Sequence, residues 1–155
     1  MNIFISYSTK DMALIKEIET RLIPYGNIYY WDKDKQIGER DWDQIFNWIC
    51  KSDIVLAIIT ENVVSRAMAV GNEIGFAKNQ DKFIIPIITN NVSESELGCL
   101  KGITYERIDI SNPWPVLEKI EATIRSKKEK EDFWRVIGII SLVLIVLIIW
   151  PRVSK

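Results

Sequence analysis

The sequence predicts an α/β protein built on a doubly wound parallel sheet, because short apolar segments alternate with amphipathic ones along most of its length. Residues 53–60 (DIVLAIIT) form an almost continuous apolar run, as expected of a strand that is buried on both faces. Pro86 favours an edge or bulge position for the strand that contains it. The expected strands cover residues 2–7, 28–31, 53–60, 83–88 and 103–110.

Helices are expected between these strands, since apolar residues recur there at helical spacing. The first helix is expected to be capped at Ser8 or Thr9 and to end at Pro24 and Gly26. Its buried face is expected to consist of Met12, Ile15, Ile18 and Leu22. Residues 32–40 are expected to form a charged loop. Further helices are expected over residues 41–51, 65–77 and 114–127, with one short helical turn over 94–100.

Length and composition exclude several functions. At 155 residues the chain is expected to form one domain, and its net charge of −1 gives no general electrostatic case for nucleic-acid binding. The sequence contains no histidine, which excludes Ser-His-Asp and Cys-His nucleophile systems and HExxH zinc sites. We expect no metal site, and we expect Cys50 and Cys99 to be reduced because their spacing is not that of a pair.

The C-terminal segment predicts a membrane anchor. Residues 136–150 carry no charge, and the longer segment 133–150, with Arg135 snorkelling outward, reaches about 27 Å as a helix. Trp134 and Trp150 stand near its two ends, as interfacial aromatic residues do. A buried core helix or an oligomerisation helix is the alternative. We expect a soluble domain over 1–127, a charged juxtamembrane linker over 128–132, a transmembrane helix over 133–150 and a short tail over 151–155.

The orientation of this anchor follows from the basic residues that precede it. Lysines and arginines are more numerous before the apolar segment than after it, where only Arg152 and Lys155 follow. Because basic residues stay on the cytoplasmic side, the large domain is expected in the cytoplasm, on a single-pass C-terminal tail anchor. The basic residues before the segment are Arg125, Lys127, Lys128 and Lys130.

A single acid, Glu73, is the leading candidate for a functional residue. It lies in the helix expected over residues 65–77 (SRAMAVGNEIGFA), beside an inward stripe and between Gly71 and Gly75. Two glycines in one short helix indicate close approach of something to the backbone. This helix directly follows the third strand, and open parallel sheets bind ligands outside the carboxyl ends of their strands. The stripe consists of Ala67, Val70, Ile74 and Ala77.

Two familiar uses of such a sheet do not fit. The sequence has neither the GxGxxG of a dinucleotide fold nor the GxxxxGK[ST] of a P-loop. A phosphoacceptor receiver domain would need an aspartate at the end of the third strand, where Thr60 stands.

The order and spacing of several segments resemble the TIR (Toll/interleukin-1 receptor) domain family, especially its prokaryotic members. The matching segments, within residues 1–125, are NIFISYS with Lys10-Asp11, YYWD with a charged loop containing Gly38, KSDIVLAIIT, and VGNEIGFA followed by FIIPIIT. The resemblance implies a flavodoxin-like, five-stranded fold and cleavage of the nicotinamide–ribose bond of NAD⁺. It also implies that Glu73 is the essential acid. NAD⁺ is then a substrate, and no cofactor is expected.

The implied chemistry suits this composition. Nicotinamide leaves as a neutral molecule, so no general acid is needed, and a carboxylate near C1′ or on the ribose hydroxyls stabilises an oxocarbenium-like transition state. Ala69 stands four residues before Glu73, where catalytic members often carry tryptophan, and Trp42 or Trp31 is the alternative stacking surface. The candidate substrate-binding residues are Phe4, Ser6, Trp31, Asp32 and Ser65.

The family resemblance also implies self-association through the loop 32–40, for which we select Lys35, Gly38 and Arg40. In this family neighbouring domains complete each other's sites, and a membrane anchor favours such assembly. The product would be ADP-ribose, or a cyclic or conjugated ADP-ribose signal read by a downstream effector. The resemblance suggests a role in bacterial anti-phage immunity.

Two other functions stay open. A non-catalytic TIR scaffold would use the same surfaces to recruit partners. A nucleoside deoxyribosyltransferase-like enzyme shares the fold and a glycosyl-bond glutamate, but the apolar C-terminal segment argues against it.

Overall fold

A computed structural model describes the backbone of residues 1–36, 38, 40–64 and 67–153, and the side chains of these residues except 67 and 143–153. The chain divides into two compact units, Met1–Lys119 and Ile120–Lys155. The first unit contains the sheet and the candidate site. The second consists of the continuation of the last helix.

The first unit is built on a five-stranded, wholly parallel sheet with the strand order β2-β1-β3-β4-β5. This order is the flavodoxin-like form of the doubly wound sheet, and it confirms the predicted fold class. The strands are β1 (Asn2–Ser6), β2 (Asn27–Tyr29), β3 (Ile54–Ile59), β4 (Phe83–Thr89) and β5 (Glu106–Ile108).

The prediction for Pro86 is half right. Its strand, β4, is internal, because β3 and β5 pair on either side of it. However, the β4–β5 ladder covers only Ile87–Thr89, so β5 does not pair at Pro86. On its other side Pro86 stands in register with Ala57 of β3. The proline therefore lies where one side of an internal strand is locally an edge, which a residue without an N–H group tolerates.

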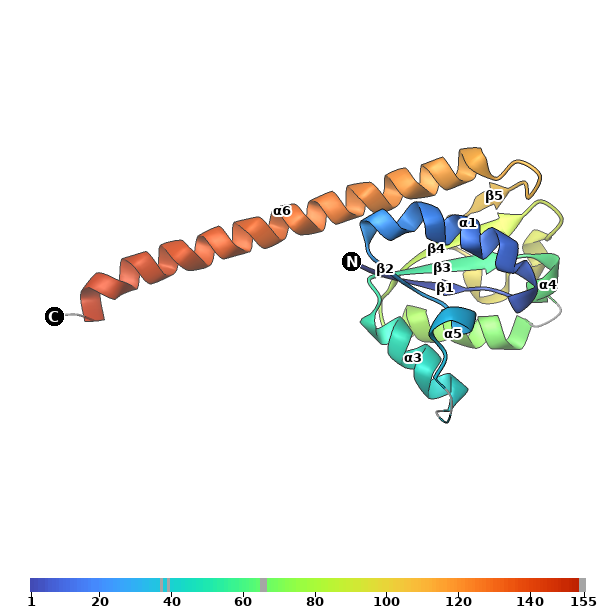
Figure 1. Ribbon diagram of the computed structural model, residues 1–155, viewed down its shortest axis with the longest axis horizontal. Helices are drawn as coiled ribbons and strands as arrows, with labels where there is room; N and C mark the ends of the chain where they lie inside the picture. The colour runs from blue at the N-terminus through green and yellow to red at the C-terminus, as the bar shows by residue number, and fades with distance from the viewer. Residues whose placement is uncertain (37, 39, 65–66, 154–155) are drawn as a thin grey trace. The chain divides into compact units, whose positions relative to one another are not determined.

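Helices cover both faces of the sheet. Figure 1 shows α1 (Met12–Leu22) on one face, and α3 (Asp41–Lys51) and α5 (Ala67–Asn79) on the other. The limits of α3 agree with those predicted from its apolar spacing. The shorter helices are η1 (Thr9–Asp11), η2 (Ile23–Tyr25), α2 (Trp31–Asp34), α4 (Glu61–Val64) and η3 (Glu94–Leu100).

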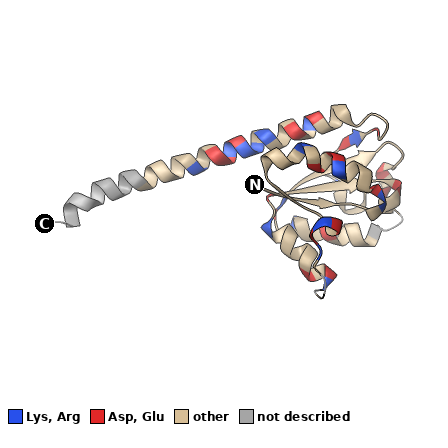
Figure 2. Ribbon diagram, in the orientation of Figure 1, with Lys and Arg blue, Asp and Glu red and all other residues tan. Residues whose placement is uncertain are grey.

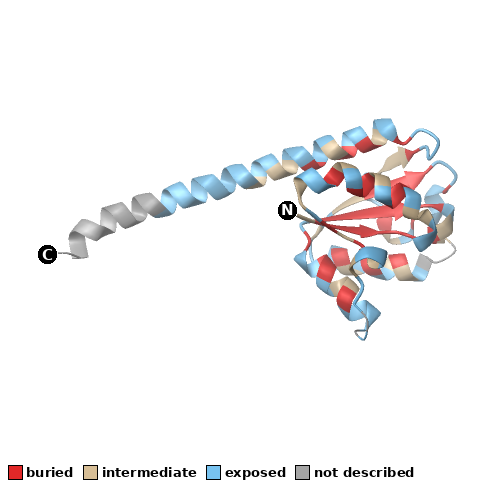
Figure 3. Ribbon diagram, in the orientation of Figure 1, coloured by how far each residue is buried: buried red, intermediate tan, exposed pale blue. Residues whose placement is uncertain are grey.

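The core lies between the sheet and its helices. All six residues of β3 are buried, and β1 to β4 carry no charged side chain (Figures 2 and 3). On the α3 and α5 face, Phe4 and Val55 of the strands pack with Trp48 and Ile49 of α3 and Ala77 of α5. Burial of this apolar surface is the main stabilising term for such a sheet, and it fixes the helix that carries Glu73.

Three predicted elements need correction. The strand expected over 28–31 ends at Tyr29. The short helix α2 begins at Trp31 and continues into the segment 32–40, which was expected to be a loop. Helix α4 precedes α5 and was not predicted. The strand expected over 103–110 is limited to the three residues of β5. Each difference falls in a segment too short for apolar periodicity to identify.

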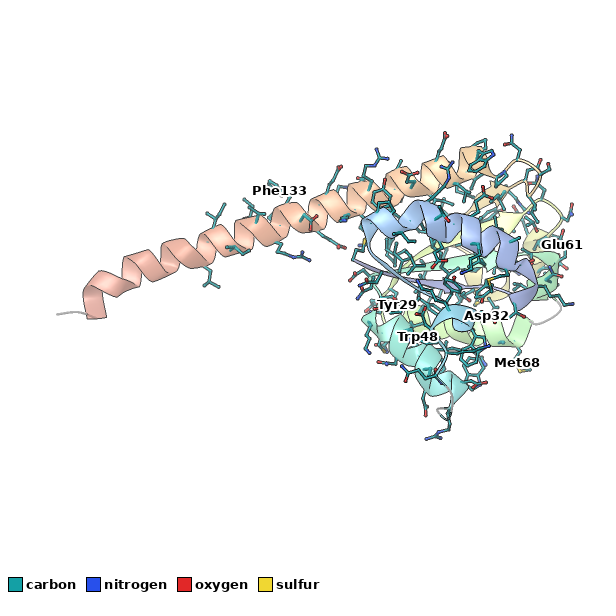
Figure 4. All side chains as sticks on the ribbon, in the orientation of Figure 1. Tyr29, Asp32, Trp48, Glu61, Met68 and Phe133 are labelled. Carbon is teal, nitrogen blue, oxygen red and sulfur yellow. The ribbon has the colours of Figure 1, made fainter. Side chains whose placement is uncertain are left out.

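The last helix, α6 (Trp114–Val153), is much longer than the predicted 114–127 and includes residues 128–132, which we expected to be a linker. Ion pairs one turn apart, Arg125–Glu121 and Lys127–Glu131, stabilise its charged part. Beyond it, large apolar side chains are exposed, from Phe133 (labelled in Figure 4) to Leu142. No helix in the described part of the chain is both long and apolar enough to cross a membrane. Residues 143–150 of the predicted span lie outside the residues whose side chains are described.

Candidate functional site

The candidate site lies at the carboxyl end of β1, the strand next to the centre of the sheet. Strand β1 lies between β2 and β3, and the chain crosses over from one side of it to the other. Ligands of open α/β sheets bind at such a crossover, in the crevice outside the strand ends. Three side chains that follow β1, those of Tyr7, Ser8 and Thr9, line a cleft there.

Glu73 reaches this cleft from α5. Its neighbours Val70 and Ile74 are buried in the core that α5 shares with β3 and β4, so the orientation of the helix is fixed. Glu73 itself is only 9% exposed, yet it lines the cleft. The Ser6 hydroxyl donates a hydrogen bond of 2.5 Å to its Oε2 atom. A buried carboxylate requires such partners, because desolvation of an unpaired charge is costly.

The cleft encloses about 200 Å³ between the end of β1 and the helices α2, α3, α4 and α5. Apolar side chains and aromatic rings form most of its wall, and the charged residues in the described lining are Glu73 and Asp41. Both are acids. The described lining consists of Tyr7, Ser8, Thr9, Trp31, Asp41, Trp42, Ile45, Val63, Ala69, Val70 and Glu73.

Two tryptophans supply aromatic surface to the cleft. Trp31, from the first turn of α2, packs against Trp48 of α3, with ring centroids 6.1 Å apart. Trp42, from the first turn of α3, packs on Phe46, with ring centroids 5.5 Å apart. Asp32 and Trp48, which are labelled in Figure 4, mark α2 and α3. Both rings therefore rest on aromatic neighbours that limit their rotamers.

Tyr7 links the end of β1 to α2. Its hydroxyl donates a 2.5 Å hydrogen bond to Asp32 Oδ2 and accepts one of 3.3 Å from the Asp32 backbone N–H. Burial, and secondly the bond to the Asp32 carboxylate, raise the pKa of Tyr7 well above its ordinary 10.0. The phenol is therefore neutral over the physiological range and acts as a fixed donor. It holds the turn that carries Trp31.

A second polar network connects α2 to helix α1. The Glu19 carboxylate of α1 forms an ion pair with the Lys33 ammonium at 2.8 Å. It also accepts a 2.7 Å hydrogen bond from the buried Tyr30 hydroxyl. Lys16 contacts both Glu19 and Tyr30. Burial alone would raise the pKa of Glu19, but hydrogen bonds from Lys33, Tyr30 and Lys16 outweigh it and lower this pKa to about 2. Glu19 is thus an ionised structural acid.

The structure distributes the predicted substrate-binding residues over different environments. Trp31 lines the cleft, and Ser6 supports Glu73 from the core with 1% exposure. Asp32 is bonded to Tyr7 and is not among the described lining residues. Phe4 belongs to the core, where it contacts Trp48. Ser65 lies outside the described residues.

The residues selected for self-association lie in the segment between α2 and α3. Lys35 is within 3.7 Å of Asp32, and Arg40 pairs with Asp43 at 3.0 Å while its side chain stays 89% exposed. Gly38 has a φ of +92°, a conformation that residues with a Cβ atom rarely adopt. The backbone conformation of the turn therefore accounts for a glycine at this position, independently of any role in self-association.

Sequence reasoning missed Asp41 as a residue of the cleft, and it named Trp42 only as one of two alternative stacking surfaces. Both were assigned to the first turn of a helix, where an acid and an apolar stripe are ordinary. Their position beside Glu73 arises from the packing of α3 on α5, in which Phe46 stacks on Phe76 at 4.3 Å. Tyr7 was predicted to lie at this edge of the sheet because it stands at the end of the first strand, and it lines the cleft.

The close approach predicted at the two glycines of α5 is not made by any described residue of this chain, and it stays a prediction for a ligand or a partner. A Cβ atom placed on Gly71 or Gly75 would meet no described atom within 4 Å. Close packing against the described residues therefore does not explain them.

Thr60, at the position where a receiver domain would carry its aspartate, has a structural role. Its hydroxyl donates a 2.6 Å hydrogen bond to Asp11, which also accepts one of 2.6 Å from Asn62. These bonds tie η1 to the first turn of α4. In the described part of the chain, no group of three or more histidines, cysteines or acids is arranged to hold a metal ion, and both cysteines are free.

Comparison with known proteins identifies the family. No curated protein matches the chain. The TIR domains of the activated Roq1 resistosome, which directly recognizes the pathogen effector XopQ, are similar in structure, with 18% identity and a TM-score of 0.53. That match covers 86% of this chain and 78% of the other, and it shows the fold alone. The family model described as "TIR domain" matches residues 3–132. This chain therefore belongs to the TIR domain family.

Proposed function

We propose that this TIR domain is an NAD⁺ nucleosidase that cleaves the nicotinamide–ribose bond with Glu73 as its essential acid. The observation that carries the proposal is the nearly buried Glu73 carboxylate, which borders the cleft at the crossover of the sheet and is hydrogen-bonded by Ser6. An acid held in this way is poised to meet positive charge on a bound ligand.

The reaction needs few groups from the protein. The bond between C1′ and the pyridinium nitrogen breaks, and its electron pair moves to the ring, which leaves as neutral nicotinamide. The positive charge that develops on C1′ and the ring oxygen of the ribose is stabilised by the Glu73 carboxylate. Addition of water at C1′ and loss of one proton give ADP-ribose. An internal nucleophile of the same molecule gives a cyclic product instead.

The size of the cleft supports an assembly-dependent enzyme. Its volume of about 200 Å³ is below the roughly 300–1,000 Å³ usual for small-molecule sites. It suits the nicotinamide riboside end of NAD⁺, while the remainder would extend toward Lys35, Gly38 and Arg40. A neighbouring domain would then complete the site, and the resistosome to which the similar TIR domains belong is consistent with such self-association.

The exposed apolar side chains of α6 support an anchor that would concentrate these domains on a membrane. Trp134 is 68% exposed and Leu142 65%, and such surfaces are rarely left in water. The anchor would be residues 133–150, single-pass, with the TIR domain in the cytoplasm. We propose a bacterial anti-phage role, in which infection clusters the domains and a downstream effector reads the product. Flotation of the full chain with vesicles, compared with a chain lacking residues 133–155, tests the anchor: equal flotation would contradict it.

The enzymatic proposal is tested with the full chain on vesicles, at low and high surface density, by following nicotinamide release from NAD⁺. We expect release that rises steeply with density and is abolished in Glu73→Ala. Glu118→Gln, at an exposed acid in the first turns of α6, is the matched control and should be fully active. Absence of release at high density would overturn the enzyme and leave the non-catalytic scaffold. Product analysis by mass spectrometry then distinguishes ADP-ribose from a cyclic form.

A further inference from the structure

We infer that an apolar pocket between α5 and η3 is a second ligand site, which takes a small uncharged hydrocarbon group of about the size of one benzene ring. The pocket encloses about 160 Å³ and is bordered by the end of β3, α4, α5 and η3. Glu61 of α4 and Met68 of α5, which are labelled in Figure 4, mark two of these helices. Binding at this pocket is independent of the proposed function, and only its effect on nicotinamide release rests on that function.

The walls of the pocket favour an apolar ligand. An engineered apolar cavity of roughly 150 Å³ stays dry and binds benzene, because the ligand supplies dispersion contacts that the lining atoms lack. A polar ligand of the same size would lose hydrogen bonds to water on entry. Aliphatic side chains of the core cluster that joins α5 to β3 and η3 form most of the described lining: Ile59, Val63, Val70, Ile74, Leu97 and Leu100.

The two polar side chains of the described lining, Glu96 and Cys99, already have partners. The Glu96 carboxylate accepts a 2.8 Å hydrogen bond from the Ser93 backbone N–H, in the capping box at the start of η3. The half-buried Cys99 thiol donates a hydrogen bond of 3.8 Å to the Gly71 carbonyl oxygen. Glu96 and Gly98 are exposed, so the pocket opens to solvent along η3. A ligand can therefore enter from solvent and reach an aliphatic interior.

Gly71 leaves space for the ligand. It is half-buried and lines the pocket, yet a Cβ atom at its position would meet no described atom within 4 Å. The two observations agree if the missing side chain leaves volume that belongs to the pocket. A glycine inside a helix costs about 1 kcal/mol relative to alanine, and an open pocket gives this glycine a role. Gly75, one turn later, is exposed and is not among the described lining residues.

The pocket and the cleft share a wall. Val63 of α4 and Val70 of α5 line both of them, and the two side chains are only 3% and 5% exposed. Glu73 follows Val70 by one turn of the same helix. Atoms that border a void lack neighbours on one side, so a ligand in the pocket would add contacts to the segment that carries Glu73. Occupancy of the pocket is therefore expected to restrain α5.

Methyl NMR of the full chain in detergent micelles tests the pocket, with fluorobenzene as the apolar probe and phenol as a polar probe of similar size. We expect fluorobenzene to shift the methyl signals of Ile74, Leu97 and Leu100. The signals of Ile15 and Ile18, which are buried on α1 at the opposite face of the sheet, should stay unchanged. Phenol at the same free concentration should bind about tenfold more weakly. Equal shifts on both faces of the sheet, or none at the pocket, would overturn the inference.

Variants at the two glycines of α5 locate the bound probe. Gly71→Leu fills the pocket and should abolish the methyl shifts. Gly71→Ala, which meets no described atom, should fold and weaken fluorobenzene binding several-fold. Gly75→Ala is the matched control and should bind as the wild type does. Circular dichroism establishes that each variant is folded, and Gly71→Ala decides if Gly71→Leu is not. Undiminished binding in Gly71→Ala would contradict the proposed position of the ligand.

The effect on catalysis is measured separately, by nicotinamide release on vesicles at a fixed density. Saturating fluorobenzene should raise release by the wild type about two- to fivefold, since a restrained α5 holds the acid in place, and should not change release by Gly71→Leu. Methyl shifts in a protein that releases no nicotinamide would support the pocket and refute the nucleosidase. Release without methyl shifts would support the nucleosidase and overturn the pocket. Methyl shifts with release that ignores the probe would support the pocket and overturn its coupling to the cleft.

Discussion

The Ser6 hydroxyl, at the end of β1, donates a 2.5 Å hydrogen bond to the carboxylate of Glu73 on α5, although 67 positions separate the two residues in the sequence. The bond joins β1, which lies at the crossover of the sheet, to helix α5. It also meets part of the hydrogen-bonding demand of a carboxylate that is 9% exposed. The two residues therefore act together: Glu73 faces the ligand, and Ser6 orients Glu73.

Ser6→Ala tests this relationship. Removal of the donor leaves the buried acid with one partner fewer, so we expect a loss of about 1–3 kcal/mol in the free energy of unfolding. We also expect kcat for nicotinamide release to fall about tenfold, because the carboxylate loses its fixed rotamer. Urea denaturation and steady-state kinetics measure the two effects. Ser6→Thr, which keeps a hydroxyl, should recover part of the activity, and full activity in Ser6→Ala would contradict the orienting role.

Tyr7→Phe tests the link between β1 and α2. The variant keeps the ring contact with Tyr30 at 6.0 Å but loses the bond to Asp32. We expect the unfolding free energy to fall by about 1 kcal/mol. Since Trp31 then loses its fixed position, KM for NAD⁺ should rise more than kcat falls. Equal KM values for the variant and the wild type would show that the bond does not position α2.

The Glu19 network predicts a pH dependence of stability. The folded-state pKa of Glu19 is lowered to about 2 from 4.5, so its ionised form favours the folded protein. This contribution is complete above pH 4.5 and is lost as the pH falls from 4.5 toward 2. At its full extent it amounts to about 3 kcal/mol. The urea concentration at the midpoint of unfolding, measured as the pH is lowered from 4.5 toward 2, should fall less steeply in Glu19→Gln than in the wild type. Parallel curves for the two proteins would contradict the prediction.

Gly75→Ala tests the unexplained glycines of α5. A Cβ atom at Gly75 would meet no described atom within 4 Å, so the alanine should fit without strain. We expect it to stabilise the domain by about 0.5–1 kcal/mol, because alanine restricts the unfolded chain and favours helix. Thermal unfolding checks this, with Gly38→Ala as a contrasting variant that should be destabilised because of its φ of +92°. Activity that falls while stability rises would assign the glycine face of α5 to contact with a neighbouring domain.

The sequence predicted the regular elements well where apolar spacing was long and consistent. The limits of α3 were right because four apolar residues recur over three turns. The strand expected over 53–60 was found as β3, one residue shorter at each end, because its six apolar residues are all buried. Trp31 was misassigned to a strand because it continues the aromatic run YYW, although its backbone begins a helix. The strand order followed from the family resemblance, since periodicity carries no information about which strands are neighbours.

The candidate site was predicted in part. Glu73 was found from its place beside a buried stripe after the third strand, and Trp31 from its place near the end of the second. Contacts such as Tyr7–Asp32 and the pairing of Glu19 with Lys33 join residues far apart in the sequence, and local patterns do not reveal them. Asp41 was missed for the same reason, since its position beside the cleft depends on how α3 packs on α5. Trp42, which shares that position, was named only as one of two alternative stacking surfaces.

The measurement that tests the central claim most directly is nicotinamide release by the full chain and by Glu73→Gln, both at high density on vesicles. The substitution keeps the size of the side chain and its ability to accept the Ser6 hydrogen bond, but it removes the negative charge. We expect release by the wild type and a loss of at least about 100-fold in kcat in Glu73→Gln, the scale of a lost electrostatic contact at a transition state. Equal rates in the two proteins, or no release by the wild type, would contradict the account.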